Sequence, residues 1–182
     1  GVASAVSYAA GHQAALSLIP ARAVMTFSIG KLGHLLDRLR ATRAVVSAGP
    51  IGRKYVDQLL LAATTKLGFD PLSDDKWREQ GLDLDGPFVF GYLADDKGVL
   101  VVRALPDAGQ KAASFLAKGL ADPATKCEPS DAFVVCFDSE AMPLVKQVDQ
   151  SIWATASKQI DAETQKMGLL FYANLSAVPA LK

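Results

Sequence analysis

The sequence has few of the residues that build soft-metal and redox sites, because its 182 residues include only two histidines and two cysteines. It also has no excess of either charge, since 19 Lys and Arg residues balance 19 Asp and Glu residues. A polyanion-binding protein usually carries a basic excess, so nucleic acid is not expected as a partner. We expect no cofactor and no zinc site, because too few ligands are present.

Long apolar runs are also missing. The first 21 residues contain no charged side chain, but serine, glycine, histidine and glutamine interrupt them, so no membrane span is expected there. Two interpretations of residues 1–20 remain open. They form an Ala-rich helix that ends before Pro20, or they are a tether or export-signal remnant with Ala3-Ser-Ala5 as a small-residue cleavage pattern.

The composition is that of a globular protein. Half of the residues are hydrophobic and 21% are charged, which allows a buried core and excludes intrinsic disorder. Apolar periodicity and turn residues predict alternating strands and helices. The predicted strands are 23–29, 87–93, 98–105, 133–137 and 169–175, with a weaker strand around Cys127. The predicted helices are 31–40, 55–67, a short one carrying Trp77, 108–120, 139–145 and 151–167. Residues 41–53 are predicted to form a looser connection.

This order predicts an α+β fold, in which helices pack on one face of a mixed or mostly antiparallel sheet of about five or six strands. Leu59 and Leu120 are expected on the buried faces of their helices. We assign residues 21–168 to one α+β module. Residues 169–182 supply a final strand that either forms an edge of this module or opens a second copy.

A similarity between residues 23–32 and 169–178 raises the second option. Each segment is an apolar strand followed by a small residue and a helix-like start, and the two lie 146 residues apart. A repeat at this distance indicates a duplicated module. The alternative is that two buried strands resemble one another by composition alone.

Cys127 and Cys136 flank a predicted turn at residues 129–132. A hairpin centred between Asp131 and Ala132 would place them directly opposite, where a non-hydrogen-bonded pair brings the Cβ atoms close enough for a disulfide. A different register would separate them. We expect the disulfide if the protein is exported and two reduced core cysteines if it is cytosolic.

No catalytic site is expected. His34 and Asp37 lie three residues apart on a predicted helix and can touch. Neither Ser28 nor Ser47 lies in a nucleophile-elbow sequence. His34 flanks an apolar stripe, so we expect it at the surface or its boundary, and we expect the same of His12.

Residues 47–54 resemble a phosphate loop only superficially. They lack the Gly-x4-Gly-Lys-Ser/Thr spacing, and Pro50 removes a backbone donor. We therefore expect a plain Gly/Pro connection. Arg53 and Lys54 after it could meet an anion, as any solvated pair could.

The charges are distributed unevenly. Residues 22–66 hold eight basic and two acidic side chains, whereas residues 67–96 hold eight acidic and two basic ones. Either this asymmetry orients a partner or pairs copies head to tail, or the two segments neutralise one another after folding.

The acidic segment also raises the question of calcium. Five aspartates could supply oxygen ligands, but the calcium-loop spacing is absent, so no metal site is expected. These residues are Asp70, Asp74, Asp75, Asp83 and Asp85. In the same region Trp77, like Trp153 further on, is expected to anchor the core or its boundary.

Four segments together carry a resemblance. They are the strand–helix unit that follows Ile19–Ala23, and the segments Leu67–Pro71, Gly81–Pro87 and Ala104–Asp107. Over residues 19–120 this pattern resembles bacterial exported proteins and lipoproteins of unknown function, built from one or two α+β modules. The resemblance implies a periplasmic or cell-surface location and a non-enzymatic module, and it assigns no site residues. A lipid anchor, if the protein has one, is expected outside this chain.

These observations favour a non-catalytic cell-envelope module that acts by protein–protein contact or self-association. A carrier of a small or lipid-like ligand, held between sheet and helices, is the first alternative. The second is a hydrolase that uses His34 with an unidentified serine. A cytoplasmic location is the alternative to the envelope.

Overall fold

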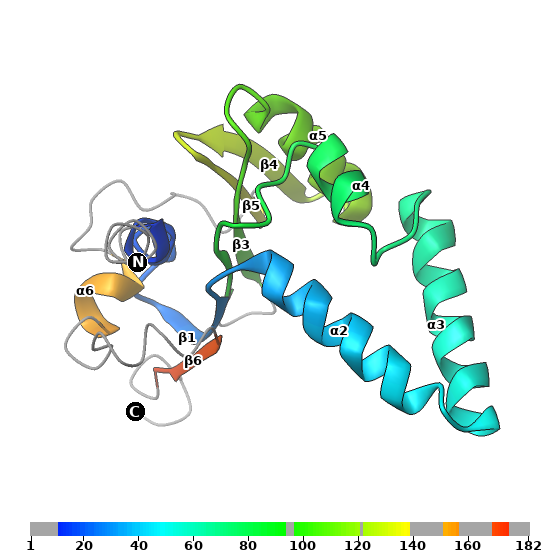
Figure 1. Ribbon diagram of the computed structural model, residues 1–182. Helices are drawn as coiled ribbons and strands as arrows, with labels where there is room; N and C mark the ends of the chain where they lie inside the picture. Colours follow the sequence, from blue (N-terminus) through cyan, green and yellow to red (C-terminus); the bar gives the residue numbers. More distant parts are fainter. Residues whose placement is uncertain (1–10, 94–96, 121, 139–150, 157–168, 175–182) are drawn as a thin grey trace, which may run out of the picture.

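A six-stranded antiparallel sheet forms the centre of the molecule (Figure 1). The computed structural model describes residues 11–93, 97–120, 122–138, 151–156 and 169–174. The strand order is β4-β5-β3-β2-β1-β6, and every neighbouring pair is antiparallel. The strands are β1 Ala23–Ile29, β2 Phe88–Leu93, β3 Gly98–Arg103, β4 Thr125–Ser130, β5 Phe133–Asp138 and β6 Leu169–Ala173.

Helices accompany this sheet, and the predicted α+β class is confirmed. The helices are α2 Leu32–Val46, α3 Pro50–Leu67, α4 Asp74–Glu79, α5 Gly109–Leu120 and α6 Ile152–Ala156, preceded by a helical segment at residues 11–16. The predicted helix 139–145, most of the predicted helix 151–167 and residues 1–10 lie outside the described residues.

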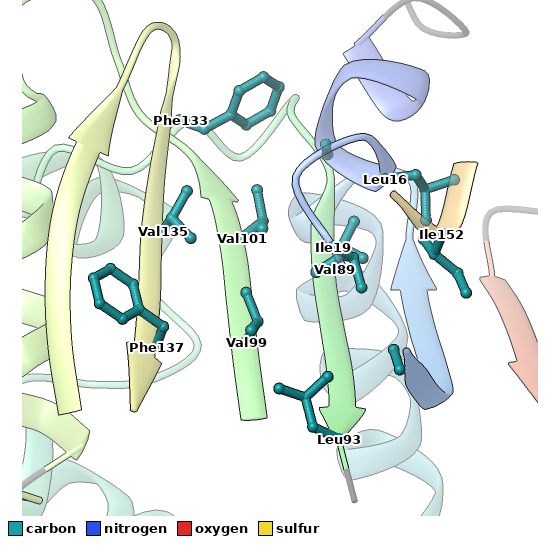
Figure 2. Close-up of a cluster of buried hydrophobic side chains, with 12 residues drawn as sticks. Leu16, Ile19, Val89, Leu93, Val99, Val101, Phe133, Val135, Phe137 and Ile152 are labelled. Atoms are coloured by element: carbon teal, nitrogen blue, oxygen red, sulfur yellow. The ribbon is translucent and has the colours of Figure 1, made fainter. Parts of the chain in front are cut away.

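The first face of the sheet carries the larger core cluster (Figure 2). Alternate residues of the central strands point to this face, among them Val89, Val101 and Val135. Leu16 and Ile19 from the N-terminal segment and Ile152 from α6 pack onto them. Trp153 is partly buried against the same cluster, as expected of a boundary anchor.

The second face is covered by α5, but only in part. Ala112 and Ala113 of α5 are buried against Val102, Val134 and Cys136. Strand β5 is buried along its length on both sides. Helices therefore contact both faces of the sheet. The expectation for Leu120 is wrong: this residue at the end of α5 is 43% exposed.

Trp77 anchors α4 to α5. Its ring lies edge-on to Phe69 and Phe115, with centroid distances of 5.2 and 5.9 Å. Its Nε1 donates a hydrogen bond of 2.8 Å to the carbonyl oxygen of Pro71. A partly buried indole with a satisfied N–H is the boundary anchor that the sequence predicted.

Helices α2 and α3 form a long hairpin, which we call the arm (residues 32–67). The expectation of a loose connection over residues 41–53 is wrong, because α2 continues to Val46 and α3 begins at Pro50. Proline is favoured at a first helical position, since the N–H that it lacks would have no helical partner. Gly52 allows the tight turn, because a Cβ atom there would collide with the carbonyl of Val46.

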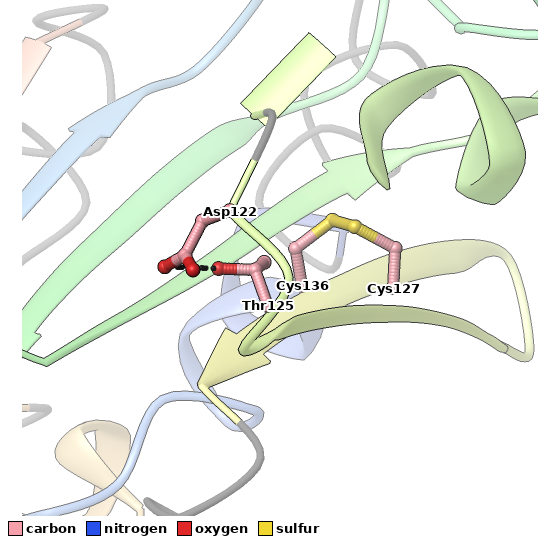
Figure 3. The surroundings of a disulfide bond; sticks show 4 residues. All are labelled: Asp122, Thr125, Cys127 and Cys136. Atoms are coloured by element: carbon pink, nitrogen blue, oxygen red, sulfur yellow. Dashed lines mark hydrogen bonds between the residues drawn. A yellow bond between two sulfur atoms is a disulfide. The ribbon is translucent and has the colours of Figure 1, made fainter. Parts of the chain in front are cut away.

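The cysteine hairpin has the predicted register. Cys127 pairs with Cys136, their Cα atoms lie 4.0 Å apart, and they form a disulfide (Figure 3). At the start of β4, the Thr125 hydroxyl donates a hydrogen bond of 3.2 Å to Asp122 (Figure 3). The disulfide faces the second core cluster and ties the edge strand β4 to β5.

Strand β6 lies at the other edge and pairs with β1. The pairing includes Thr26 with Tyr172, which are 146 residues apart, and runs from Met25–Ala173 to Ile29–Leu169. This separation equals the offset of the sequence similarity between the two strands. Whether β6 opens a second copy of the module stays a prediction.

Removing the disulfide is expected to lower the free energy of unfolding by about 2–3 kcal/mol, because the bridge closes a short loop whose entropy the unfolded chain regains. The double variant Cys127→Ala/Cys136→Ala, compared with wild type by urea denaturation, measures this loss. Dithiothreitol should destabilise wild type to a similar extent and leave the variant unchanged. Equal stability of wild type with and without reductant would contradict the expectation.

Candidate functional site

A histidine–serine pair lies within the core. Nε2 of His12 and Oγ of Ser28 share a hydrogen bond between the N-terminal helical segment and β1. The expectation that His12 lies at the surface is wrong, since only 4% of it is exposed. His12, Ala15 and Leu16 have i, i+3, i+4 spacing, so they share the helical face that packs on the sheet.

This pair does not have the features of a hydrolytic site. Ser28 is fully buried, so its hydroxyl is closed to a substrate. Burial also lowers the pKa of His12, which therefore stays neutral at physiological pH. A neutral imidazole bonded to a hydroxyl satisfies polar atoms inside the core and fixes the N-terminal segment to β1.

His34 lies exposed on α2, as predicted. Its predicted neighbour Asp37 instead accepts a hydrogen bond of 2.7 Å from Nη1 of Arg40. Ser47 lies beyond the end of the same helix. The structure therefore does not bring His34 and the two candidate serines together.

Arg40 fixes the base of the arm. Its Nε and Nη2 donate hydrogen bonds of 3.0 and 2.6 Å to the carbonyl oxygen of Leu72, and Nη2 also pairs with Asp74. The hydrogen bond to Asp74 raises the pKa of the Arg40 guanidinium. Nearby, Lys31 forms an ion pair of 3.4 Å with Asp85. Basic and acidic segments therefore neutralise one another where the arm joins the sheet.

The aspartates considered as calcium ligands are largely engaged in these contacts. Asp74 and Asp85 pair with the arm, and Asp83 pairs with Arg103 at 3.2 Å. Across the described ranges, no group of three or more His, Cys, Asp and Glu side chains is placed to hold a metal ion.

Residues 47–54 form the turn of the arm. Nε of Arg53 donates a hydrogen bond of 3.3 Å to the carbonyl oxygen of Ser47, while Lys54 is exposed. An open hollow of about 540 Å³ lies beside this turn, lined by arginines together with Asp57. Its open shape and the arginines around it do not suit a buried lipid-like ligand.

The arm carries most of the exposed apolar surface. Among the described residues eleven large hydrophobic side chains are exposed, and seven of them lie on α2 and α3. Helix α3 buries none of its residues, so the expectation that Leu59 is buried is wrong. The seven are Leu39, Val45, Val46, Ile51, Tyr55, Leu59 and Leu61.

Three of these residues form a stripe along α3. Ile51, Tyr55 and Leu59 are spaced four residues apart, so they lie on one side of the helix, and they are 64–74% exposed. We call them the arm stripe. Leu61 is equally exposed, at 68%, but it points to the other side of α3, between Lys54 and Asp57. A contiguous exposed apolar stripe is typical of an interaction surface.

Comparison with known protein families, curated proteins and solved structures found no match to this chain. None of the helices in the described ranges combines the length and the hydropathy that crossing a bilayer requires.

Because burial lowers the pKa of His12, acidification is expected to destabilise the fold. Below the ordinary histidine pKa of about 6.5, the unfolded chain binds a proton that the folded chain does not, so this contribution is present above pH 6.5 and is lost as the pH falls. The slope for one proton is at most about 1.4 kcal/mol per pH unit. Urea denaturation of wild type and His12→Gln between pH 7.5 and 5 measures it, and parallel stability curves would refute the assignment.

Proposed function

We propose that this chain is a non-catalytic module of the bacterial cell envelope that acts by protein–protein contact or self-association. The observation that carries the proposal is the arm: a two-helix hairpin that buries only Leu36 among its described side chains, while seven large hydrophobic residues face solvent. Monomeric proteins rarely leave large apolar patches exposed without a partner.

The envelope location is supported by the Cys127–Cys136 disulfide. Structural disulfides persist in the periplasm and at the cell surface, whereas the cytosol keeps most thiols reduced. The bacterial envelope is also the location implied by the resemblance of residues 19–120. We propose a periplasmic or cell-surface location on these two grounds.

A ligand carrier is the second candidate, and one hollow favours it. A depression of about 340 Å³ lies between the sheet and the end of α5, and its lining includes Phe90, Leu100 and Leu120. It opens onto the surface beside other exposed apolar side chains, which fits a docking surface better than an enclosed ligand site. Hydrolysis by His34 is less well supported, because this histidine projects from the arm and Ser28 is closed to substrate.

The contact function predicts that a partner touches the arm stripe. Replacing Leu59 with photoreactive p-benzoylphenylalanine should give a protein adduct upon irradiation in the cells that produce the chain. The same replacement at Leu61 is the matched control, because this residue is equally exposed on the other side of α3. We expect the adduct at position 59 to be at least fivefold stronger than at position 61. Equal labelling, or no adduct at either position, would contradict the proposed function.

A further inference from the structure

A second uncovered apolar surface lies on the sheet. Directly paired residues point to the same face, so Phe27 shares a face with its partners Phe90 and Phe171. Met25 follows the same alternation along β1. Helix α5 covers the other half of this face, over β4 and β5. We call Met25, Phe27, Phe90 and Phe171 the open sheet surface.

This surface and the arm together account for ten of the eleven exposed large hydrophobic side chains of the described residues. Met25, Phe90 and Phe171 are 42%, 39% and 63% exposed. The remaining one, Leu120, lines the hollow of about 340 Å³ next to Phe90. Within the described ranges, half of one apolar sheet face therefore has no helix on it, and the apolar side of α3 has no sheet against it.

The arm is held away from its own open sheet surface. In Figure 1, α2 leads away from the end of β1, and α3 lies far from β1 and β6. Backbone bonds from Leu32 to Gly86 (3.1 Å) and from Gly33 to Leu84 (2.8 Å) fix the start of α2, and Arg40 fixes its middle. Folding the arm back would break these contacts or the helix.

We infer that the partner of the arm is a second copy of this chain, in a two-fold dimer where the arm stripe of each copy packs on the open sheet surface of the other. This inference rests on the proposed function and names its partner. In a two-fold dimer the two contacts are equivalent and association closes at two copies, which is the commonest arrangement of identical chains.

The two surfaces match in size. Ile51 and Leu59 are eight residues apart, which corresponds to about 12 Å along a helix. Strands β2 and β6 are separated by β1, so Phe90 and Phe171 lie two strand spacings apart, about 10 Å. The arm stripe is therefore long enough to cross the three strands.

Charge also favours a second copy. The arm, residues 32–67, carries six basic and two acidic side chains, a net charge of +4, and because the whole chain is neutral the other residues carry −4. The arm of one copy thus meets an oppositely charged body on the other. Beside the open sheet surface, the hollow next to Phe90 is lined by two acidic side chains, Asp122 and Asp138, and one basic side chain, Lys97.

The buried area suffices for a dimer. Each interface contains three side chains of the arm stripe and the three exposed side chains of the open sheet surface. At roughly 100 Å² each they bury about 600 Å², and the two symmetric interfaces bury about 1,200 Å², the lower end of the range for stable complexes.

Sedimentation velocity across a concentration series tests the inference on the 182-residue chain. We expect wild type to dimerise, and Leu59→Asp and Phe171→Asp each to raise the dissociation constant at least tenfold. Leu61→Asp, the matched control on α3, should change it less than twofold. An equimolar mixture of Leu59→Asp and Phe171→Asp should sediment as a dimer at concentrations where each alone is monomeric, because the mixed dimer keeps one intact interface.

Other outcomes would overturn the inference. A wild type that is monomeric at every concentration excludes the dimer, and a dimer that Leu59→Asp disrupts but Phe171→Asp does not is held together by arm–arm contact. Circular dichroism checks each fold, and Met25→Asp replaces Phe171→Asp if the latter unfolds. A position-59 adduct with a different protein, found with a monomeric wild type, retains the proposed function and refutes only the second copy.

Discussion

Apolar side chains on both faces of the same strands are the constraint on which the rest of the structure depends. From Phe133 to Phe137, β5 is buried on alternate sides, so the sheet needs a layer on each face. The N-terminal segment and α6 supply one layer, and α5 supplies half of the other. The other half, over β2, β1 and β6, has the same apolar character, and no helix of the part of the chain that the structure describes packs on it.

Ion pairs and hydrogen bonds of α2 and of the residue before it set the direction in which the arm leaves the sheet. Arg40 binds the Leu72 carbonyl and Asp74, and Lys31 binds Asp85, so oppositely charged segments of the chain meet there. These contacts direct α2 away from the sheet. Because these contacts hold α2 and not α3, the apolar stripe of α3 stays exposed. Local ion pairs thus leave an apolar helix side exposed to solvent.

Much of the sheet could be predicted from sequence, since alternation and turn residues are local signals. The cysteine hairpin is the clearest case, because its turn at Asp131 fixes the register that joins Cys127 to Cys136. The end of α2 was missed because the adjacent β-branched residues Val45 and Val46 lower the helix propensity of residues 41–46. Pro50 was expected within a plain Gly/Pro connection, whereas it begins α3, because proline suits a first helical position.

The candidate surface could not be predicted, for a different reason. Periodicity shows that one side of α3 is apolar but does not show what covers it, so Leu59 was expected in a core and lies exposed. The open sheet surface depends on pairing between β1, β2 and β6, which are far apart in sequence. His12 was also missed, although its spacing to Ala15 and Leu16 is a local signal.

The central claim is that the arm stripe and the open sheet surface cover one another. Hydroxyl-radical footprinting over a range of protein concentrations tests it most directly, because it reports the solvent access of individual side chains. The account predicts that Tyr55, Met25 and Phe171 lose reactivity together as concentration rises, while Leu61 does not change. Protection of Tyr55 with Met25 and Phe171 still reactive, or constant reactivity of all four, would contradict it.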